Sequence, residues 1–401
     1  MPFFFQFKST VLWLSCILLA CAQTPRPKVV ETDELVLLGA ERTEVYLPWL
    51  KGKRVAVVAN QTSIIPKNDH QIHLVDSLLS LEVDIISVFA PEHGFRGQSD
   101  AGEKVSDGVD TATGLPIISL YGKNRKPTKE QLTEIDVVVF DIQDVGVRFY
   151  TYIATLQLVM EACAEIGIPV IVLDRPNPNG HYIDGPTMEK EHRSFLGMNP
   201  IPLVYGMTIG EYAAMVNGEG WLSKGLAVDL KVVPLLHYDH DMEYALPVRP
   251  SPNLPNDKAI NLYPSLGLFE GTAVNAGRGT EWQFQRFGAS FLDSTHFDFR
   301  YVPHPNFGAK YPKEEANTCF GKDLSKHPKM QSVSLTWLIE AYTHSTDHEK
   351  VFKTEGFTKH AGTTRLQQQI ESGMPEKEIR ASWQQDLEDF KKIRSKYLLY
   401  E

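Results

Sequence analysis

The chain has 401 residues, of which 42% are hydrophobic and 22% are charged. This composition is typical of a globular protein, excludes a mainly disordered chain, and is long enough for two hydrophobic cores. The formal net charge is -10 and no run of five basic residues occurs, so a nucleic-acid partner is not expected.

The amino terminus has the pattern of an export leader, predicted over residues 1–22. Residues 3–22 are mainly apolar and are followed by a proline-containing stretch. Leu18-Leu19-Ala20-Cys21 resembles a lipoprotein cleavage box, in which Cys21 would carry the lipid that anchors the protein to a membrane. Ala20-x-Ala22 equally fits ordinary cleavage after Ala22, which would give a soluble exported protein. We expect an exported, periplasmic protein, lipid-anchored in the first case.

Between residues 54 and 174, short β-branched runs alternate with amphipathic stretches, which predicts a parallel sheet wrapped by helices. We expect an α/β fold, with a Rossmann-like catalytic domain over 40–250 and a smaller α+β domain over 256–401 that closes the cleft. The proline-rich stretch 246–256 is the expected connector. The predicted strands are 54–60, 84–90, 116–120, 136–141, 169–174 and 227–233, and the predicted helices include 72–81, 152–166 and 208–217, with further helical patterning over 363–400.

Polar residues follow four of these strands: Asn60, Glu92, Asp141 and Asp174 stand at or just after the strand ends. The carboxyl ends of parallel strands lie along one edge of a sheet, so these side chains are expected to converge.

The segment Pro91–Gly97 reads PEHGFRG and places Glu92, His93 and Arg96 on a glycine-hinged loop. Glu92 is the leading catalytic candidate, as a general acid that protonates a departing oxygen in a cleft. His93 and Arg96 are expected to bind substrate. The alternative is a carboxylate that pairs with Arg96 and only shapes the loop.

The second polar cluster, Asp141–Tyr152, follows the strand 136–141. Asp141 and Asp144 are candidates for the second carboxylate of a glycoside hydrolase, and Asp144 and Arg148 are candidates for substrate binding. The alternative for Asp141 is a structural role, such as capping the loop or orienting Arg148. Tyr150 is a candidate sugar platform, with packing at the start of the helix as its alternative.

Two further loops supply candidates. Asp174 and Asn177 lie on a proline-stiffened loop that suits sugar hydroxyls, although turn structure explains its other residues as well. In the glycine-rich stretch 270–281, Arg278 is a candidate for substrate binding and Glu281 for catalysis.

The sequence contains no motif for a nucleotide cofactor, a serine nucleophile elbow or a metalloprotease zinc site. No cofactor and no metal are therefore expected. The run His237–Asp241 contains ligand-type residues but has no partner tract.

Taken together, the motifs resemble the exo-β-N-acetylmuramidase family, once catalogued as a domain of unknown function. They span nearly all of the chain after the leader and comprise PEHGFRG (91–97), FDIQDVGVRFYTY (140–152), LDRPNPNG (173–180), GPTME (185–189), YGMTIGEYA (205–213), LFEGTAVNAGRGTEWQFQRFGA (268–289) and YLLY (397–400). Residues 282–285 depart from the Pro-Phe-Glu type of run expected there.

The resemblance implies a glycoside hydrolase that releases terminal β-linked N-acetylmuramic acid from the non-reducing end of peptidoglycan fragments, without a nicotinamide cofactor. It places the site in a cleft between two domains, with Glu92 as the favoured catalytic group. The lactyl carboxylate of muramic acid requires a fixed cation, for which Arg148 or Arg278 is preferred over Arg96. Water would be placed by Asp141 or Glu281, or the sugar's own acetamide would be the nucleophile.

Two other functions fit the same pattern. One is an esterase, amidase or deacetylase that acts on the cell wall through a water nucleophile. The other is a periplasmic protein that binds muropeptides without cleaving them. The oligomeric state is left open.

Overall fold

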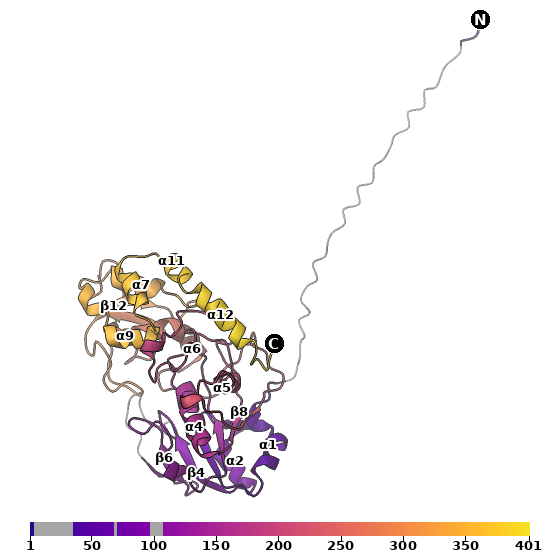
Figure 1. Ribbon diagram of the computed structural model, residues 1–401. Helices are drawn as coiled ribbons and strands as arrows, with labels where there is room; N and C mark the ends of the chain where they lie inside the picture. The colour runs from indigo at the N-terminus through magenta and orange to yellow at the C-terminus, as the bar shows by residue number, and fades with distance from the viewer. Residues whose placement is uncertain (4–34, 68–69, 97–106) are drawn as a thin grey trace. The chain divides into compact units, whose positions relative to one another are not determined.

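The computed structural model describes residues 1–3, 35–67, 70–96 and 107–401 (Figure 1). From Val36 to Glu401 the chain forms one compact unit. Residues 4–22 of the expected leader, which include Cys21, lie outside the described residues. The leader therefore stays a prediction. No helix in the described part of the chain is long and apolar enough to cross a membrane.

The larger sheet has seven strands in the order β5-β6-β4-β1-β7-β8-β9. All neighbouring strands pair in parallel except β5, which runs antiparallel to β6. Without the edge strand β5, the strands lie across the sheet in the order β6-β4-β1-β7-β8-β9, which is the strand order of a Rossmann sheet. The α/β prediction is therefore confirmed. The strands are β1 Val55–Ala59, β4 Ile85–Ala90, β5 Gly108–Val109, β6 Pro116–Ser119, β7 Val137–Asp141, β8 Val170–Leu173 and β9 Leu230–Val233.

The central strands are buried on both faces. In β1, Ala56 and Val58 pack into one hydrophobic cluster, whereas Val55 and Val57 pack into another. Successive side chains of a strand point to opposite faces, so each apolar run feeds two cores. This explains why the strands are continuous apolar runs rather than alternating ones.

Helices α4 (Tyr152–Ile166) and α5 (Ile209–Gly218) cover the sheet and have clear end signals. Helix α4 ends at Gly167, whose φ of 75° suits glycine. Thr208 caps the start of helix α5 and forms a capping box with Glu211. The other elements before residue 250 are η1 Gly39–Glu41, α1 Thr43–Leu50, the hairpin β2 Ile64–Lys67 and β3 His70–His73, α2 Leu74–Ser80, α3 Lys129–Leu132, η2 Lys190–His192 and η3 Ser223–Gly225.

The C-terminal part combines a small antiparallel sheet, in the order β10-β12-β11, with short helices. In Figure 1, helices α7, α9, α11 and α12 lie at the opposite end of the compact unit from strands β4 and β6. The smaller α+β region is confirmed, whereas the exact division into 40–250 and 256–401 stays a prediction. The elements are α6 Asp257–Leu266, η4 Gly267–Gly271, β10 Arg286–Ala289, β11 Phe299–Tyr301, β12 Cys319–Asp323, α7 Thr336–Thr343, α8 His348–Val351, α9 Thr354–Ala361, α10 Arg365–Glu371, α11 Glu376–Ala381 and α12 Gln384–Arg394.

Candidate active site

A pocket of about 260 Å³ lies where the loop after β4, the start of α4 and the segments around α6, η4 and α9 meet. Four of the residues predicted from the sequence line it: Glu92, His93, Tyr150 and Arg278. The remaining lining residues are Tyr121, Phe149, Thr151, Leu196, Ser251, Asn253, Leu254, Tyr263, Glu270, Phe284 and His360. Both the sheet region and the C-terminal region thus contribute to one pocket.

Glu92 follows the end of β4 and is held by hydroxyl groups. Thr151 Oγ1 donates a hydrogen bond to Glu92 Oε2 at 3.1 Å, and the Tyr121 side chain also hydrogen-bonds the Glu92 carboxylate. Burial raises the pKa of Tyr121 most, and the negative charge of Glu92 raises it further. The phenol therefore keeps its proton and stays a hydrogen-bond donor. The carboxyl group is therefore oriented by its neighbours at the pocket wall.

The backbone after Glu92 is tightly turned. His93 is buried and has a φ of 73°, a region that residues other than glycine seldom occupy, and Gly94 follows with a φ of 77°. Gly94 N donates to Pro91 O at 3.0 Å, which closes the turn. Backbone strain of this kind persists only where the surroundings enforce it, and it is concentrated at functional sites.

Arg278 and Glu270 form an ion pair in the pocket, with Nη1 and Oε2 2.7 Å apart. Burial raises the pKa of Glu270, but the positive charges of Arg278 and Lys313 outweigh it and hold the pKa at about 2. Burial alone lowers the pKa of Arg278, and Glu270 more than reverses this effect. Both groups are therefore charged at neutral pH.

Tyr263 lies on α6 and lines the same pocket as Glu92 and Glu270. Burial raises the pKa of Tyr263 most, and the negative charges of Glu270 and Glu92 raise it further. The side chain is therefore a neutral phenol. Its ring packs edge-to-face on Phe149, with centroids 5.1 Å apart. Tyr150 Oη donates to Pro250 O at 2.6 Å, so the Tyr150 ring is a fixed wall of the pocket.

The sequence profiles of the exo-β-N-acetylmuramidase NamZ family match most of the chain: the N-terminal profile matches residues 55–258 and the C-terminal profile residues 261–400. The chain belongs to this family. It is 39% identical over 374 residues to the peptidoglycan β-N-acetylmuramidase NamZ of Bacillus subtilis (strain 168), covering 88% of this chain and 89% of that protein.

Two crystal structures of DUF1343 family proteins from Bacteroides fragilis NCTC 9343 share the fold of this NamZ family member. The first has a TM-score of 0.84 and 41% identity, and the match covers 92% of this chain and 99% of that one. The second has a TM-score of 0.77 and 30% identity, and the match covers 91% and 99%.

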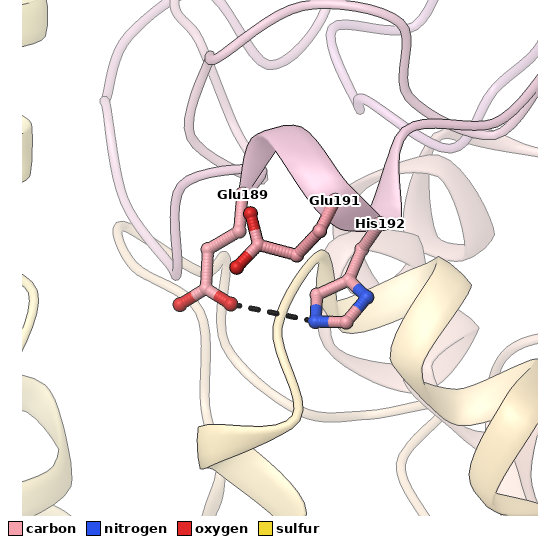
Figure 2. A group of neighbouring side chains, drawn as sticks. All are labelled: Glu189, Glu191 and His192. Atoms are coloured by element: carbon pink, nitrogen blue, oxygen red, sulfur yellow. Dashed lines mark ion pairs between the residues drawn. The ribbon is translucent and has the colours of Figure 1, made fainter.

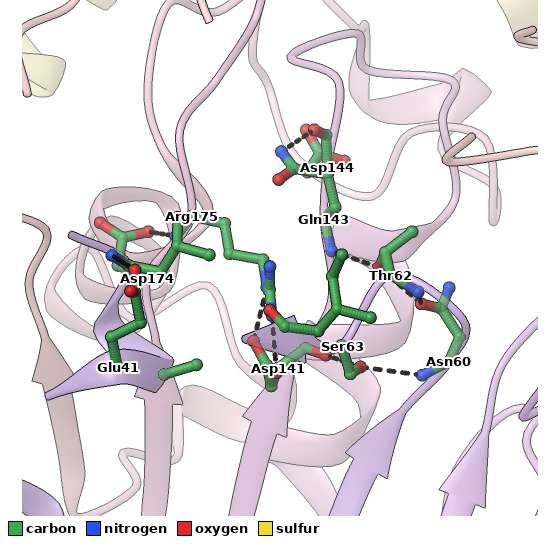
Figure 3. Close-up of polar contacts among 12 residues, drawn as sticks. Glu41, Asn60, Thr62, Ser63, Asp141, Gln143, Asp144, Asp174 and Arg175 are labelled. Atoms are coloured by element: carbon green, nitrogen blue, oxygen red, sulfur yellow. Dashed lines mark hydrogen bonds and ion pairs between the residues drawn. The ribbon is translucent and has the colours of Figure 1, made fainter. Parts of the chain in front are cut away.

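Asp141 lies outside the pocket of the NamZ family member, although it stands at the end of β7 as predicted. Figure 3 shows it facing Arg175, whose Nε and Nη2 lie 2.6 Å and 2.8 Å from the two carboxylate oxygens. Both side chains are almost fully buried. Both carboxylate oxygens are therefore occupied by Arg175, and the catalytic role of Asp141 stays a prediction.

Glu281 is also not part of the pocket lining, and its side chain is exposed. The chain turns between Gly277 and Glu281, with Thr280 N donating to Gly277 O at 3.2 Å. This turn brings Arg278 to the pocket and leaves Glu281 at the surface. The catalytic role predicted for Glu281 does not fit this position.

Two of the three predicted cation candidates are engaged elsewhere. Arg148 is fully buried and donates to four backbone carbonyls, those of Pro186, Ile201, His360 and Ala361, at 2.6 to 3.0 Å. Burial lowers the pKa of Arg148 to about 9. Arg96 pairs with Asp110 at 2.8 Å and with Asp76 at 3.4 Å. Arg148 therefore ties the chain near β7 to helix α9, and Arg96 braces its own loop.

Asp144, Asp174 and Asn177 likewise hold the fold rather than line the pocket. Asp144 accepts hydrogen bonds from Tyr205 Oη and Gly146 N, and burial raises its pKa to about 7. Burial also raises the pKa of Asp174, to about 6, and this carboxylate accepts from Thr208, Gly210 and Tyr400. Asn177 Nδ2 donates to Met207 O at 2.8 Å. Polar groups at the strand ends do converge (Figure 3), but they mostly bind one another.

A cluster of Glu189, Glu191 and His192 has ligand atoms within 4.8 Å of one another (Figure 2). Glu189 Oε1 accepts from Thr363 Oγ1 and Arg365 Nε, both at 2.8 Å, and its other oxygen lies 3.5 Å from His192 Nε2. Glu189 therefore joins this loop to the start of α10. In the run 237–241, His240 Nε2 lies 2.8 Å from Glu211 Oε2, which places this histidine in the capping network of α5.

The sequence reasoning missed several pocket residues, of which Tyr263 and Glu270 matter most. Glu270 begins the glycine-rich stretch that contains Arg278, and the spacing of eight residues between them does not indicate that they are neighbours in space. Only the fold of η4 and the following loop brings the two charges together. Tyr263 lies in an ordinary amphipathic helix, so no local pattern distinguishes it from a core residue.

Proposed function

We propose that this protein is an exo-acting glycoside hydrolase that releases terminal β-linked N-acetylmuramic acid from the non-reducing end of peptidoglycan fragments. Membership of the NamZ family and 39% identity to the B. subtilis β-N-acetylmuramidase support the substrate class. The observation that carries the proposal is that Glu92 and the Arg278–Glu270 ion pair line the same pocket. One group provides the proton, and the other provides a fixed positive charge.

Glu92 is the proposed general acid. Its hydrogen bonds with Thr151 and Tyr121 hold the carboxyl group at the pocket wall, where it can reach the glycosidic oxygen of a sugar bound inside. Proton donation to a leaving oxygen by a positioned carboxylic acid is the usual first step of glycoside hydrolysis.

Arg278 is the proposed partner of the lactyl carboxylate. Of the three predicted arginines it alone lines the pocket, and its Nε is buried without a hydrogen-bond partner among the described residues. An arginine can bind two carboxylates through different edges of its planar guanidinium. Glu270 would keep Arg278 in place, and the lactyl group would bind the remaining donors.

The substrate's own acetamide is the proposed nucleophile. Asp141 and Glu281 lie outside the pocket, and Glu270 is engaged by Arg278, so no second carboxylate of the described pocket stands ready for attack. Substrate-assisted hydrolysis needs only one acid–base carboxyl group, which Glu92 supplies. Tyr263 lines the pocket, and its phenol would donate a hydrogen bond to the bound sugar.

The test is hydrolysis of a chromogenic β-N-acetylmuramide and of the matching β-N-acetylglucosaminide, which lacks the lactyl group. We expect cleavage of the muramide and little or none of the glucosaminide. Cleavage of neither, or of the glucosaminide alone, would overturn the proposal. Release of acyl groups from ester or amide substrates without sugar release would instead support a wall esterase or amidase.

We further propose that the protein is exported and anchored to a membrane through a lipid on Cys21. The support is the apolar leader pattern and the Leu-Leu-Ala-Cys box. Metabolic labelling with an alkyne fatty acid should mark the wild type and leave Cys21→Ala unlabelled. An unlabelled wild type whose mature chain begins at Gln23 would show soluble export.

A further inference from the structure

A second cavity, of about 440 Å³, lies on the surface beside the loops that form the pocket. We call it the Trp221 groove; it is lined by Trp221 and Phe195, by Arg125 and Arg193, and by Gln157 and Leu158 of α4, among others. The combination of flat apolar rings with charged and amide groups is suited to sugars, which present both C–H faces and polar edges.

The pocket and the Trp221 groove share two loops. Tyr121 lines the pocket and Arg125 of the same loop lines the groove. Leu196 lines the pocket and its neighbour Phe195 lines the groove. The Arg125 guanidinium lies over the Phe195 ring, 4.3 Å from its centroid, so the two loops touch. The pocket and the groove therefore lie on either side of a wall that these two loops form.

The position of Glu92 indicates that this is the leaving-group side. A general acid must lie next to the oxygen that departs, so the remainder of the glycan extends from the Glu92 side of the pocket. Tyr121, which hydrogen-bonds Glu92, begins the loop that leads to Arg125. The groove is thus joined to the Glu92 side of the pocket by the loop that carries Tyr121 and Arg125.

The charge of the groove is positive and uncompensated. Neither Arg125 nor Arg193 forms an ion pair with a residue that the structure describes, and both are exposed. The carboxylate in the lining, Glu161, is engaged by Ser223 N at 3.1 Å and lies 3.7 Å from Lys126. The two arginines are therefore available to an anionic ligand.

We propose that the Trp221 groove binds the glycan beyond the cleaved bond and that Arg125 and Arg193 bind the lactyl carboxylate of its next muramic acid. This inference rests on the proposed function. Because muramic acid alternates with N-acetylglucosamine, the sugar after the bond is neutral and the one beyond it carries the carboxylate. The groove makes the protein prefer glycan chains over single disaccharides.

The experiment compares kcat/KM for a chromogenic muramide, for the disaccharide MurNAc-GlcNAc and for the tetrasaccharide MurNAc-GlcNAc-MurNAc-GlcNAc. The variant is the double substitution Arg125→Ala and Arg193→Ala. Lys123→Ala is the matched control, because Lys123 is an exposed cation on the same loop that does not line the groove. The thermal midpoint of each variant reports that it is folded.

We expect the double variant to lose about tenfold in kcat/KM on the tetrasaccharide through KM, roughly the effect of one charge-assisted hydrogen bond. The disaccharide and the chromogenic muramide should be cleaved as by the wild type, and Lys123→Ala should match the wild type on all three. This inference would be overturned if the double variant cleaved the tetrasaccharide with the kcat/KM of the wild type, or if it lost the same factor on all three substrates. The proposed function would stand in either case. A wild type that cleaves none of the three would overturn both.

Discussion

Arg278 Nη1 and Glu270 Oε2 lie 2.7 Å apart at the wall of the pocket that Glu92 also lines. The pair is only eight residues apart in sequence, and the fold of η4 and the following loop aims both side chains inward. Because a partly buried guanidinium without a counter-ion is costly, Glu270 stabilises Arg278 at the place where a substrate carboxylate would bind. The site therefore presents a cation that is held before the substrate arrives.

Selectivity for muramic acid should depend on Arg278. In Arg278→Ala, the ratio of kcat/KM for the muramide to that for the glucosaminide should fall by about tenfold or more, since a hydrogen bond to a charged group contributes about 1.5–3 kcal/mol. Steady-state kinetics on the two chromogenic substrates measure this ratio. Arg300→Ala is the control, because Arg300 is exposed and stacks on Phe320 outside the pocket lining. A ratio that stays at the wild-type value in Arg278→Ala would contradict the assignment.

Glu270 should stabilise the protein only above acidic pH. Its pKa is held at about 2 in the folded state, below its ordinary value of 4.5, so the unfolded chain binds the proton more readily. This stability is fully present above pH 4.5 and is lost as the pH falls from 4.5 toward 2, by roughly 3 kcal/mol. Urea unfolding of the wild type and Glu270→Gln across this range should show a steeper loss in the wild type. Parallel curves would show that Glu270 is not held ionised by its neighbours.

Asp141 should be structural and not catalytic. Removing its charge in Asp141→Asn leaves Arg175 buried and unpaired, which should cost about 3–5 kcal/mol of unfolding free energy. The folded fraction at low temperature should keep a kcat close to that of the wild type. Asp136→Asn is the control, because its pair with Arg54 is solvent-exposed and should contribute little. Unchanged stability together with a large loss of kcat would show a catalytic role for Asp141.

Hydrolysis should proceed with retention if the acetamide is the nucleophile. Two displacements at the same carbon restore the original configuration, so the first product seen by proton NMR should be β-N-acetylmuramic acid, before it equilibrates in water. Initial appearance of the α-anomer would mean that water attacks directly and that a second basic group acts in the pocket.

Most of the sheet could be predicted from the sequence. The expected strands 84–90 and 136–141 correspond to β4 and β7, and the expected helix 152–166 has the bounds of α4. Short β-branched runs that alternate with amphipathic stretches are typical of a parallel sheet wrapped by helices. The capping box of Thr208 and Glu211 is equally local, because both partners lie within one helical turn.

The site was harder to predict than the sheet. The end of a strand fixes the backbone position of a residue but not the direction of its side chain. Glu92 follows the end of β4 and Asp141 is the last residue of β7, yet only Glu92 lines the pocket. Arg175 from the neighbouring strand end binds Asp141. Arg148 reaches carbonyl groups of residues 360 and 361, more than two hundred positions away. Such long-range partners leave no local pattern in a single sequence.

The proposed mechanism depends above all on Glu92 as the proton donor to the leaving group. The most direct test is kcat/KM of Glu92→Gln on two muramides, MurNAc-GlcNAc, whose leaving oxygen needs a proton, and the 2,4-dinitrophenyl muramide, whose leaving group does not. We predict a loss of about 10²–10⁴-fold on the disaccharide and a far smaller loss on the dinitrophenyl substrate, with folding intact. An equal loss on both substrates, or full activity on the disaccharide, would contradict it.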